Sequence, residues 1–263
     1  MRQNLKNIWG FISGAVIGIL GGLMGFGGAK FRLPVLVGYF KFTTIQAIII
    51  NLIVSLSTVF FSFIFRSTSI PISDVLDNYY VILNLLAGSV VGAFLGVRIA
   101  TKISSDRLNK IVFLFLLFLG LFLITHAFIH FQQKALSTPI QIITGVFAGV
   151  IIGLFSSMLG VAGGELIIPT IILLFGVDIK LAGSLSLCIS FPTVIIGILK
   201  YRSSDQFKIT KENTLFIILM SIGSILGAYV GSRILIGISE TVLQITLGII
   251  LLISSVKIFM HRK

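Results

Sequence analysis

Charged residues are scarce in this sequence. Only 11% of its 263 residues are Asp, Glu, Lys or Arg, whereas a soluble domain averages about 25%. Long runs such as 111–124 and 215–222 carry no charge at all. A helix that crosses a bilayer needs roughly 20 mostly apolar residues. Most of the chain divides into blocks of that size, which excludes a large soluble domain and predicts an all-α integral membrane protein.

Cysteine and acidic residues are also few. The single cysteine, Cys188, cannot form an intramolecular disulfide, and it lies in an apolar block. Eight acidic against twenty basic residues give a net charge of +12. In a soluble protein, such a positive net charge would indicate a nucleic-acid partner. Here the basic residues lie in short loops, where they set orientation and contact anionic lipid. We therefore expect contact with membrane lipid and no nucleic-acid partner.

The motifs of the common enzyme classes are missing. The sequence has no phosphate-binding loop ending in Gly-Lys-Ser/Thr, which argues against direct use of ATP. Its glycine cluster lacks the dinucleotide-binding spacing, and no paired carboxylates, metal cluster or nucleophile with its base is evident. We expect neither an enzyme nor a metal or other cofactor, with a proton or sodium ion as the candidate coupling ion.

The chain repeats itself at an offset of 135 residues, the distance from Pro34 to Pro169. Matches of Gly, Pro and Arg in one register at both ends of a half indicate duplication. We therefore divide the chain into repeats 1–135 and 136–263. The clearest matches pair Gly18 with Gly153, Gly25 with Gly160, Gly28 with Gly163, Ser55 with Ser190, Thr58 with Thr193, Gly88 with Gly223, Ser89 with Ser224, and Arg98 with Arg233.

Each repeat opens with a stretch that a glycine cluster interrupts, at 21–28 and at 160–164. Each glycine lowers helix stability by about 1 kcal/mol, so we expect both clusters to leave the helical conformation. We predict two half-length helices in each stretch, joined at membrane depth, and three full spans after it. The predicted segments are a hairpin at 8–40 with spans near 45–65, 80–100 and 111–131, and a hairpin at 140–175 with spans near 181–199, 213–232 and 241–259.

The basic residues predict the orientation of these segments, because Lys and Arg are enriched in cytoplasmic loops. If each hairpin returns to its own side, fourteen of the twenty basic residues become cytoplasmic. Four, Arg66, Lys134, Lys180 and Arg233, lie on the far side. This arrangement gives an inverted repeat of about five membrane segments per half, with both termini cytoplasmic.

Inverted halves with interrupted helices are typical of secondary transporters. Backbone amides freed at two such breaks would line one polar site near the midplane, where helix N-termini favour an anion. Lys30 and Arg32 follow the first cluster, and Glu165 occupies the repeat position of Lys30. The basic pair could bind an anion, with Glu165 coupling protons. Alternatively, one basic residue forms a structural ion pair with Glu165, or the basic side chains extend to the cytoplasmic face.

Further candidates for the substrate-binding site are the glycines of the two breaks and polar residues of the next spans. The polar residues either line the pathway or bond to their own helices. We expect Pro34 and Pro169 to be structural helix breaks and the Gly88 and Gly223 segments to be packing ridges. The further candidates are Gly25, Gly27, Gly28, Gly160, Gly163, Gly164, Asn51, Ser55, Ser186 and Ser190.

The duplicated glycine motifs resemble the sulfite exporter TauE/SafE family, also called the TSUP family of permeases. The resemblance rests on Gly18-x6-Gly25-Phe26-Gly27-Gly28-x5-Pro34, on its echo in the second half, and on the two packing ridges. It covers essentially the whole chain. It implies a bacterial or archaeal cytoplasmic-membrane permease for small sulfur-containing anions such as sulfite, sulfonates or thiosulfate. The alternatives are an anion channel or a non-transporting scaffold, and a homo-oligomer remains open.

Overall fold

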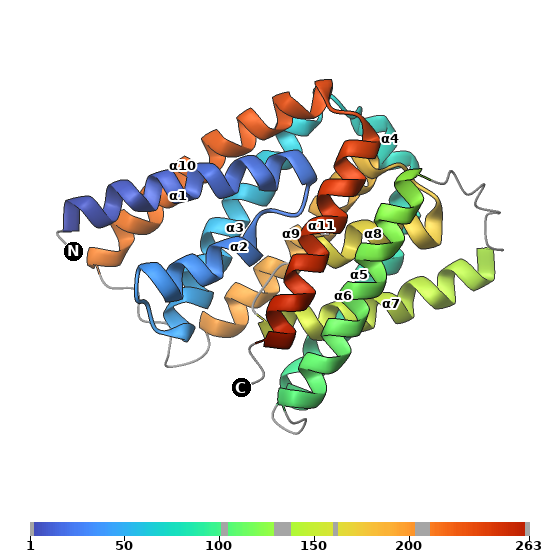
Figure 1. Ribbon diagram of the computed structural model, residues 1–263, viewed down its shortest axis with the longest axis horizontal. Coiled ribbons are helices and arrows are strands. Elements are labelled where there is room, and N and C mark those ends of the chain that lie inside the picture. The colour runs from blue at the N-terminus through green and yellow to red at the C-terminus, as the bar shows by residue number, and fades with distance from the viewer. Residues whose placement is uncertain (1–2, 101–104, 129–137, 160–162, 203–210, 261–263) are drawn as a thin grey trace.

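The computed structural model describes residues 3–100, 105–128, 138–159, 163–202 and 211–260, and every regular element in these residues is a helix. Five of the helices, α1, α3, α7, α9 and α10, contain apolar stretches long enough to cross a membrane. In chain order the elements are α1 (Gln3–Met24), α2 (Ala29–Pro34), the π-helix η1 (Val35–Tyr39), α3 (Thr44–Arg66), α4 (Ile72–Asp77), α5 (Tyr79–Ala100), α6 (Ser105–Phe128), α7 (Thr138–Leu159), α8 (Gly164–Phe175), α9 (Ile179–Arg202), α10 (Lys211–Gly237) and α11 (Glu240–Met260) (Figure 1).

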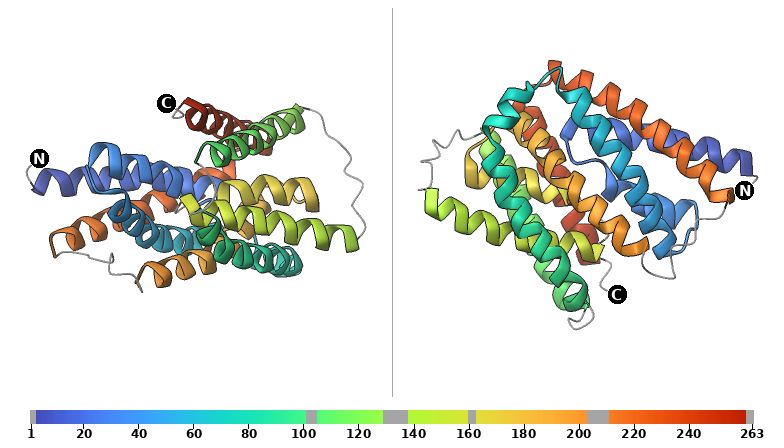
Figure 2. Two further views of the ribbon diagram at one scale, coloured as in Figure 1. Left: turned by 90° about the horizontal axis from the view of Figure 1, so that it is seen from below. Right: turned by 180° about the vertical axis from the view of Figure 1, so that it is seen from behind.

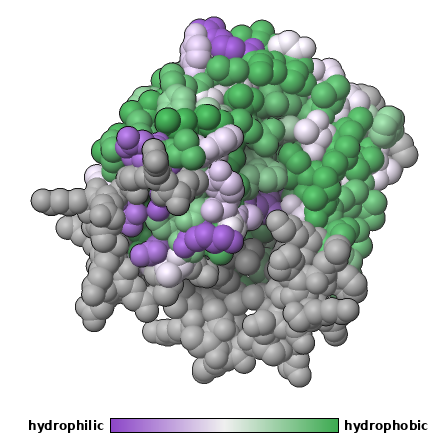
Figure 3. All heavy atoms as spheres, turned by 60° about the vertical axis from the view of Figure 1, so that its left-hand side comes forward, coloured by the Kyte–Doolittle hydropathy of each residue, from purple (hydrophilic) through white to green (hydrophobic). Residues whose placement is uncertain are grey.

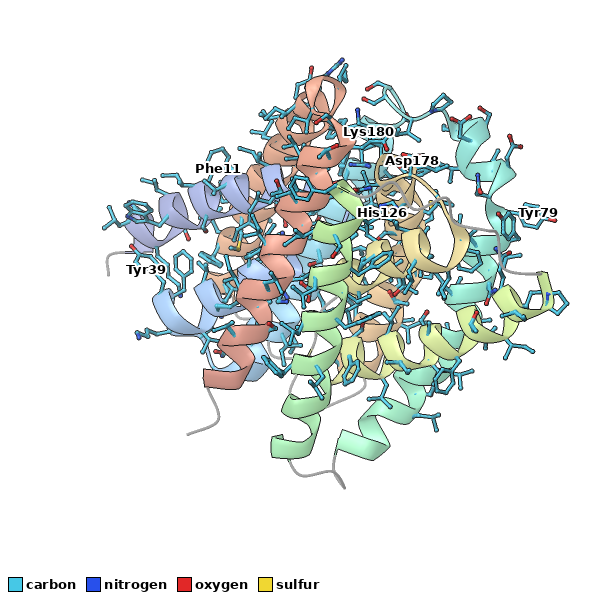
Figure 4. The ribbon with its side chains drawn as sticks, turned by 45° about the vertical axis from the view of Figure 1, so that its right-hand side comes forward. Phe11, Tyr39, Tyr79, His126, Asp178 and Lys180 are labelled. Carbon is cyan, nitrogen blue, oxygen red and sulfur yellow. The ribbon has the colours of Figure 1, made fainter. Side chains whose placement is uncertain are left out.

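The described surface is strongly apolar. Large side chains such as Phe94, Ile143 and Phe147 are 66–70% exposed. Figure 3 shows hydrophobic residues over most of the described surface of one face. A soluble monomer rarely exposes contiguous apolar areas of this extent, whereas lipid chains cover them in a membrane. Exposed Tyr39 and Tyr79 lie at opposite sides of the molecule (Figure 4), as expected of aromatic residues at the two membrane interfaces.

The order of the helices recurs along the chain. The helices α7, α8, α9 and α11 each begin 135 residues after α1, α2, α3 and α6, respectively. Helix contacts recur in the same way, because α1 packs along α10 and α7 packs along α5. The helices α6 and α11 also lie side by side (Figures 1 and 2).

Glycines let these helix pairs approach closely. A Cβ atom added to Gly18 of α1 would lie 2.8 Å from Cα of Ser224 in α10. A Cβ atom on Gly153 of α7 would lie 2.7 Å from the carbonyl carbon of Ser89 in α5. The ridges of small residues are therefore packing surfaces, as the sequence predicts.

The first arm of each hairpin is not half-length, and this corrects the sequence analysis. The helices α1 and α7 each contain 22 residues, about 33 Å at 1.5 Å per residue. Gly21 and Gly22 stay helical, because Gly21 packs against the backbone of Gly27 and Gly28 in the break, and Gly22 packs against Ala228 of α10. The break begins only at Gly25, where φ reaches +85°. Each interrupted segment is therefore a long helix followed by a short return.

The two prolines expected to break helices lie inside them. Pro34 is the last residue of α2 and runs directly into η1, and Pro169 is the sixth residue of α8. A proline removes one backbone donor and crowds the carbonyl four residues earlier. At Pro34 the helix continues with the wider π geometry, which occurs where an α-helix must accommodate a local disruption.

Candidate functional site

The two chain breaks lie close together in the structure. A Cβ atom on Gly25 would lie 2.6 Å from Cα of Gly183, near the start of α9. A Cβ atom on Gly164, the first residue of α8, would lie 2.8 Å from Cα of Phe26. The first break is therefore packed against the beginning of both α8 and α9. Of the other predicted glycines, Gly27, Gly28 and Gly163 belong to the breaks, and Gly160 lies outside the described residues.

Arg32 occupies a fully buried polar site beside the first break. Its Nη1 atom donates to Ser55 Oγ at 2.8 Å and to Asn51 Oδ1 at 3.2 Å. Its Nη2 atom donates to Ser224 Oγ at 2.9 Å, to Thr58 Oγ1 at 3.3 Å and to the Gly27 carbonyl at 3.4 Å. The structure thus brings together three predicted site residues from α2 and α3. We call the side chains around this guanidinium (Asn51, Ser55, Thr58 and Ser224) the Arg32 site.

The charge of Arg32 is not balanced within its site. All five hydrogen bonds end on neutral oxygen atoms, and no described carboxylate forms an ion pair with it. Its Nε atom is buried without a hydrogen-bond partner in the described residues. An isolated buried charge is strongly unfavourable unless a counter-charge approaches it. The site therefore has the chemistry to accept a small anion.

Lys30 behaves differently from Arg32. Its Nζ atom lies 2.8 Å from Oε2 of Glu165, with side-chain exposures of 21% and 10%. This contact joins the return arm of the first hairpin to that of the second. The ion pair considered in the sequence analysis is therefore present, and Lys30 rather than Arg32 forms it. Two of the three charges at the breaks neutralise each other, which leaves Arg32 as the excess positive charge.

The predicted residues of the second half form a separate polar group. Ser186 and Ser190 are fully buried in α9, and Ser186 Oγ donates to the Gly164 carbonyl at 3.4 Å. Ile167 stands at the repeat position of Arg32 and is also buried. The second half thus has hydroxyl groups at the equivalent positions but no charge among them.

Sequence reasoning missed Thr58 and Ser224, which complete the Arg32 site. Thr58 lies one helical turn after Ser55 on the same face of α3, so its spacing was an available signal. Ser224 comes from α10, nearly 200 residues along the chain, and only its match to Ser89 in the repeat marked it. Its proximity to Arg32 depends on the packing of α10 against α1 and α3.

Arg66 was counted among the far-side loop charges, but the structure buries it completely at the end of α3. Its guanidinium donates to the carbonyls of Gly22 and Leu23 in the last turn of α1, at 3.0 and 2.7 Å. It also donates to the Lys180 carbonyl at 2.6 Å and to Ser184 Oγ at 3.2 Å. Figure 4 places Lys180 at the beginning of α9. Arg66 therefore ties the C-terminal end of α1 to the start of α9.

Comparison with known proteins agrees with this architecture. The model of the sulfite exporter TauE/SafE family matches residues 9–258. A "Probable membrane transporter protein" of Methanocaldococcus jannaschii is 26% identical over 260 residues, which cover 91% of this chain and 90% of that protein. No solved structure matches the chain. Because the family match covers nearly the whole sequence, this multi-pass membrane protein belongs to the sulfite exporter TauE/SafE family of transporters.

Proposed function

We propose that the chain is a secondary permease for small sulfur-containing anions such as sulfite, sulfonates or thiosulfate, and that the anion binds beside Arg32. The observation that carries this proposal is the buried guanidinium, which has no counter-charge among the described residues. Its surroundings are hydroxyl and amide groups, which can rotate to donate to an oxyanion. A guanidinium binds two oxygen atoms of one anion in a planar fork, which suits sulfite and sulfonate groups.

The course of the helices supports an inverted arrangement of the two halves, which is the usual basis of alternating access. In Figure 1, α3 and α6 end in the upper part of the molecule, whereas their repeat counterparts α9 and α11 end in the lower part. The Arg32 site draws on both halves, since Ser224 belongs to the second. A relative movement of the halves would therefore change the site directly.

The Lys30–Glu165 pair is the proposed link to a coupling ion. Protonation of Glu165 would release Lys30, whose charge would then add to that of Arg32 at the breaks. Binding of a proton and of an anion would thus favour each other.

The test is anion flux into proteoliposomes that contain the purified protein. Arg32→Gln should abolish sulfite and sulfonate flux, together with the thermal stabilisation that these anions give. The matched control is Arg233→Gln, because Arg233 is exposed and lies over the Tyr229 ring at 5.2 Å. Normal flux through a folded Arg32→Gln protein would falsify the proposed site, and absence of flux in the wild type would favour a scaffold.

Flux kinetics separate a carrier from a channel. A carrier shows slow flux that saturates with anion concentration, because its site must change accessibility in every cycle. A channel shows single-channel conductance in a planar bilayer. We expect saturation and no unitary conductance.

A further inference from the structure

One face of α3 carries a continuous line of buried polar side chains. Residues at 51, 55, 58, 62 and 66 fall within about 80° of arc, at 100° per residue. We call this line the α3 polar face. All of its members are at most 1% exposed. Its residues are Asn51, Ser55, Thr58, Ser62 and Arg66.

The first three residues of the α3 polar face bind Arg32, and the last binds the ends of α1 and α9. Ser62 lies between them, about one helical turn, or 6 Å, from both Thr58 and Arg66. Its Oγ atom is completely buried and has no hydrogen-bond partner in the described residues. A serine in a membrane helix usually bonds to the carbonyl four residues earlier, as Thr58 does to Val54 at 2.7 Å. The fold does not explain why the Ser62 hydroxyl is buried without a hydrogen bond to the described residues.

The internal repeat provides a comparison. The second half keeps hydroxyl groups at 186, 190 and 193, opposite the first three positions of the α3 polar face. Opposite Ser62 and Arg66 it has Gly197 and Tyr201, and opposite Arg32 it has Ile167. The first half alone therefore carries both the buried charge and a polar line that continues beyond it. Buried polar groups of this kind inside a membrane protein typically mark the path of an ion or substrate.

We infer that Ser62 is a transit site for the anion, on the route from the Arg32 site along α3 toward the end of that helix. The inference rests on the proposed function. The unpaired hydroxyl donates to the oxyanion as it leaves Arg32. The next residue along this face is Arg66, which binds the end of α1 and the start of α9. Ser62 should therefore affect the rate of passage but not the affinity of the Arg32 site.

The first test compares Ser62→Ala with Ser57→Ala in proteoliposomes. Ser57 lies on α3 outside the polar face, and its hydroxyl bonds to the Ile53 carbonyl at 3.2 Å. Loss of a hydrogen bond to an anion should lower the maximal sulfoacetate flux of Ser62→Ala about tenfold. Its half-saturation concentration and its thermal stabilisation by sulfoacetate should stay at wild-type values. The Ser57→Ala protein should transport normally.

Two results of this comparison would overturn the inference. One is wild-type flux through Ser62→Ala, and the other is a parallel loss of flux and of anion stabilisation, which would place Ser62 in the binding site itself. In either case wild-type flux and the Arg32→Gln defect would still stand, so the proposed function would be judged separately.

A second measurement is independent of the alanine variant. Ser62→Cys, in a Cys188→Ala background, should react during turnover with the anionic thiol reagent ethylsulfonate methanethiosulfonate added on the side where α3 ends. Ser57→Cys should react much more slowly. Equal rates, or no reaction at Ser62→Cys, would contradict a route along this face.

Discussion

At the scale of single residues, Arg32 and Arg66 are both fully buried but serve different partners. Arg66 donates mainly to backbone carbonyls, including two in the last turn of α1. Those carbonyls have no partner within their own helix, so a cation there stabilises the helix end. Arg32 donates mainly to side chains that can reorient. Arg66 therefore has a structural role, which is consistent with the separate binding role that we propose for Arg32.

This difference predicts the effect of Arg66→Lys. Lysine keeps the charge but cannot reach four acceptors with one ammonium group. The variant should lose about 2 kcal/mol of stability, because buried carbonyls lose their donors. Thermal unfolding in detergent measures the loss, with exposed Arg233→Lys as the unaffected control. Equal unfolding temperatures for the two variants would show that the hydrogen bonds of Arg66 contribute little to stability.

The Lys30–Glu165 pair predicts non-additive effects. Either Lys30→Gln or Glu165→Gln leaves one partly buried charge alone and should lower stability by about 1–3 kcal/mol. The double variant removes both charges and should recover a large part of that loss. A double-mutant cycle of unfolding temperatures measures the coupling. Additive losses would mean that the two side chains are not coupled in the membrane protein.

Part of the candidate site was predictable from the sequence. Arg32, Asn51 and Ser55 follow from a charge beside a glycine cluster and from matched polar positions. Arg66 did not follow, because a basic residue at the end of an apolar span reads as a loop charge unless the neighbouring helix ends are known. An ion pair with Glu165 was only one of three alternatives that the sequence left open for the basic residues at the first break.

At the scale of helices, the close contact between α1 and α10 links packing to the site. Gly18 faces Ser224, whose hydroxyl accepts from Arg32. A methyl group on Gly18 would meet the backbone of α10, which cannot yield as a flexible side chain could. The shape of this helix pair therefore fixes one wall of the Arg32 site.

Gly18→Ala should consequently impair both stability and transport. Overpacking of this kind lowers stability by about 1–3 kcal/mol, and displacement of Ser224 removes a partner of Arg32. The control is Gly237→Ala at the end of α10, where an added Cβ meets no other atom within 4 Å. Thermal unfolding and anion flux measure the two effects. An unchanged flux in Gly18→Ala would show that the Arg32 site does not depend on the close packing of α1 against α10.

Helix bounds were predicted better than helix breaks. The span expected at 45–65 corresponds to α3 and the one at 80–100 to α5, because hydrophobic blocks define both. The glycine cluster at 21–28 was placed correctly, but half of it remains helical. Intrinsic propensity opposes a helix at Gly21 and Gly22, and the tertiary contacts of Gly21 with the break and of Gly22 with α10 outweigh it. No sequence pattern gives those two contacts.

At the scale of the whole molecule, helices from the two halves pack against each other. The first helix of each half packs along a helix of the other half, in the pairs α1 with α10 and α7 with α5. Neither half can bury its glycine face alone. We therefore expect the helices to reach their final arrangement only when both halves are present.

The proposed inverted arrangement predicts where reporter proteins fused to the chain become active. Green fluorescent protein fused to the C-terminus should fluoresce, because that end is expected in the cytoplasm. Alkaline phosphatase inserted between α6 and α7 should be active, because that connection is expected on the far side. The reciprocal fusions serve as controls. If green fluorescent protein fluoresced at both positions and alkaline phosphatase were active at neither, both positions would be cytoplasmic. An odd number of membrane crossings would then not separate them.

The pairing of α1 with α10 has a consequence for synthesis. Ribosomes add about 5–20 residues per second, so the roughly 190 residues between the two helices take about 10–40 s to make. During this time the glycine face of α1 has no partner in the growing chain. Nascent α1 must therefore be covered by lipid or by the insertion machinery until α10 emerges, and the pair can assemble only after α10 has been made.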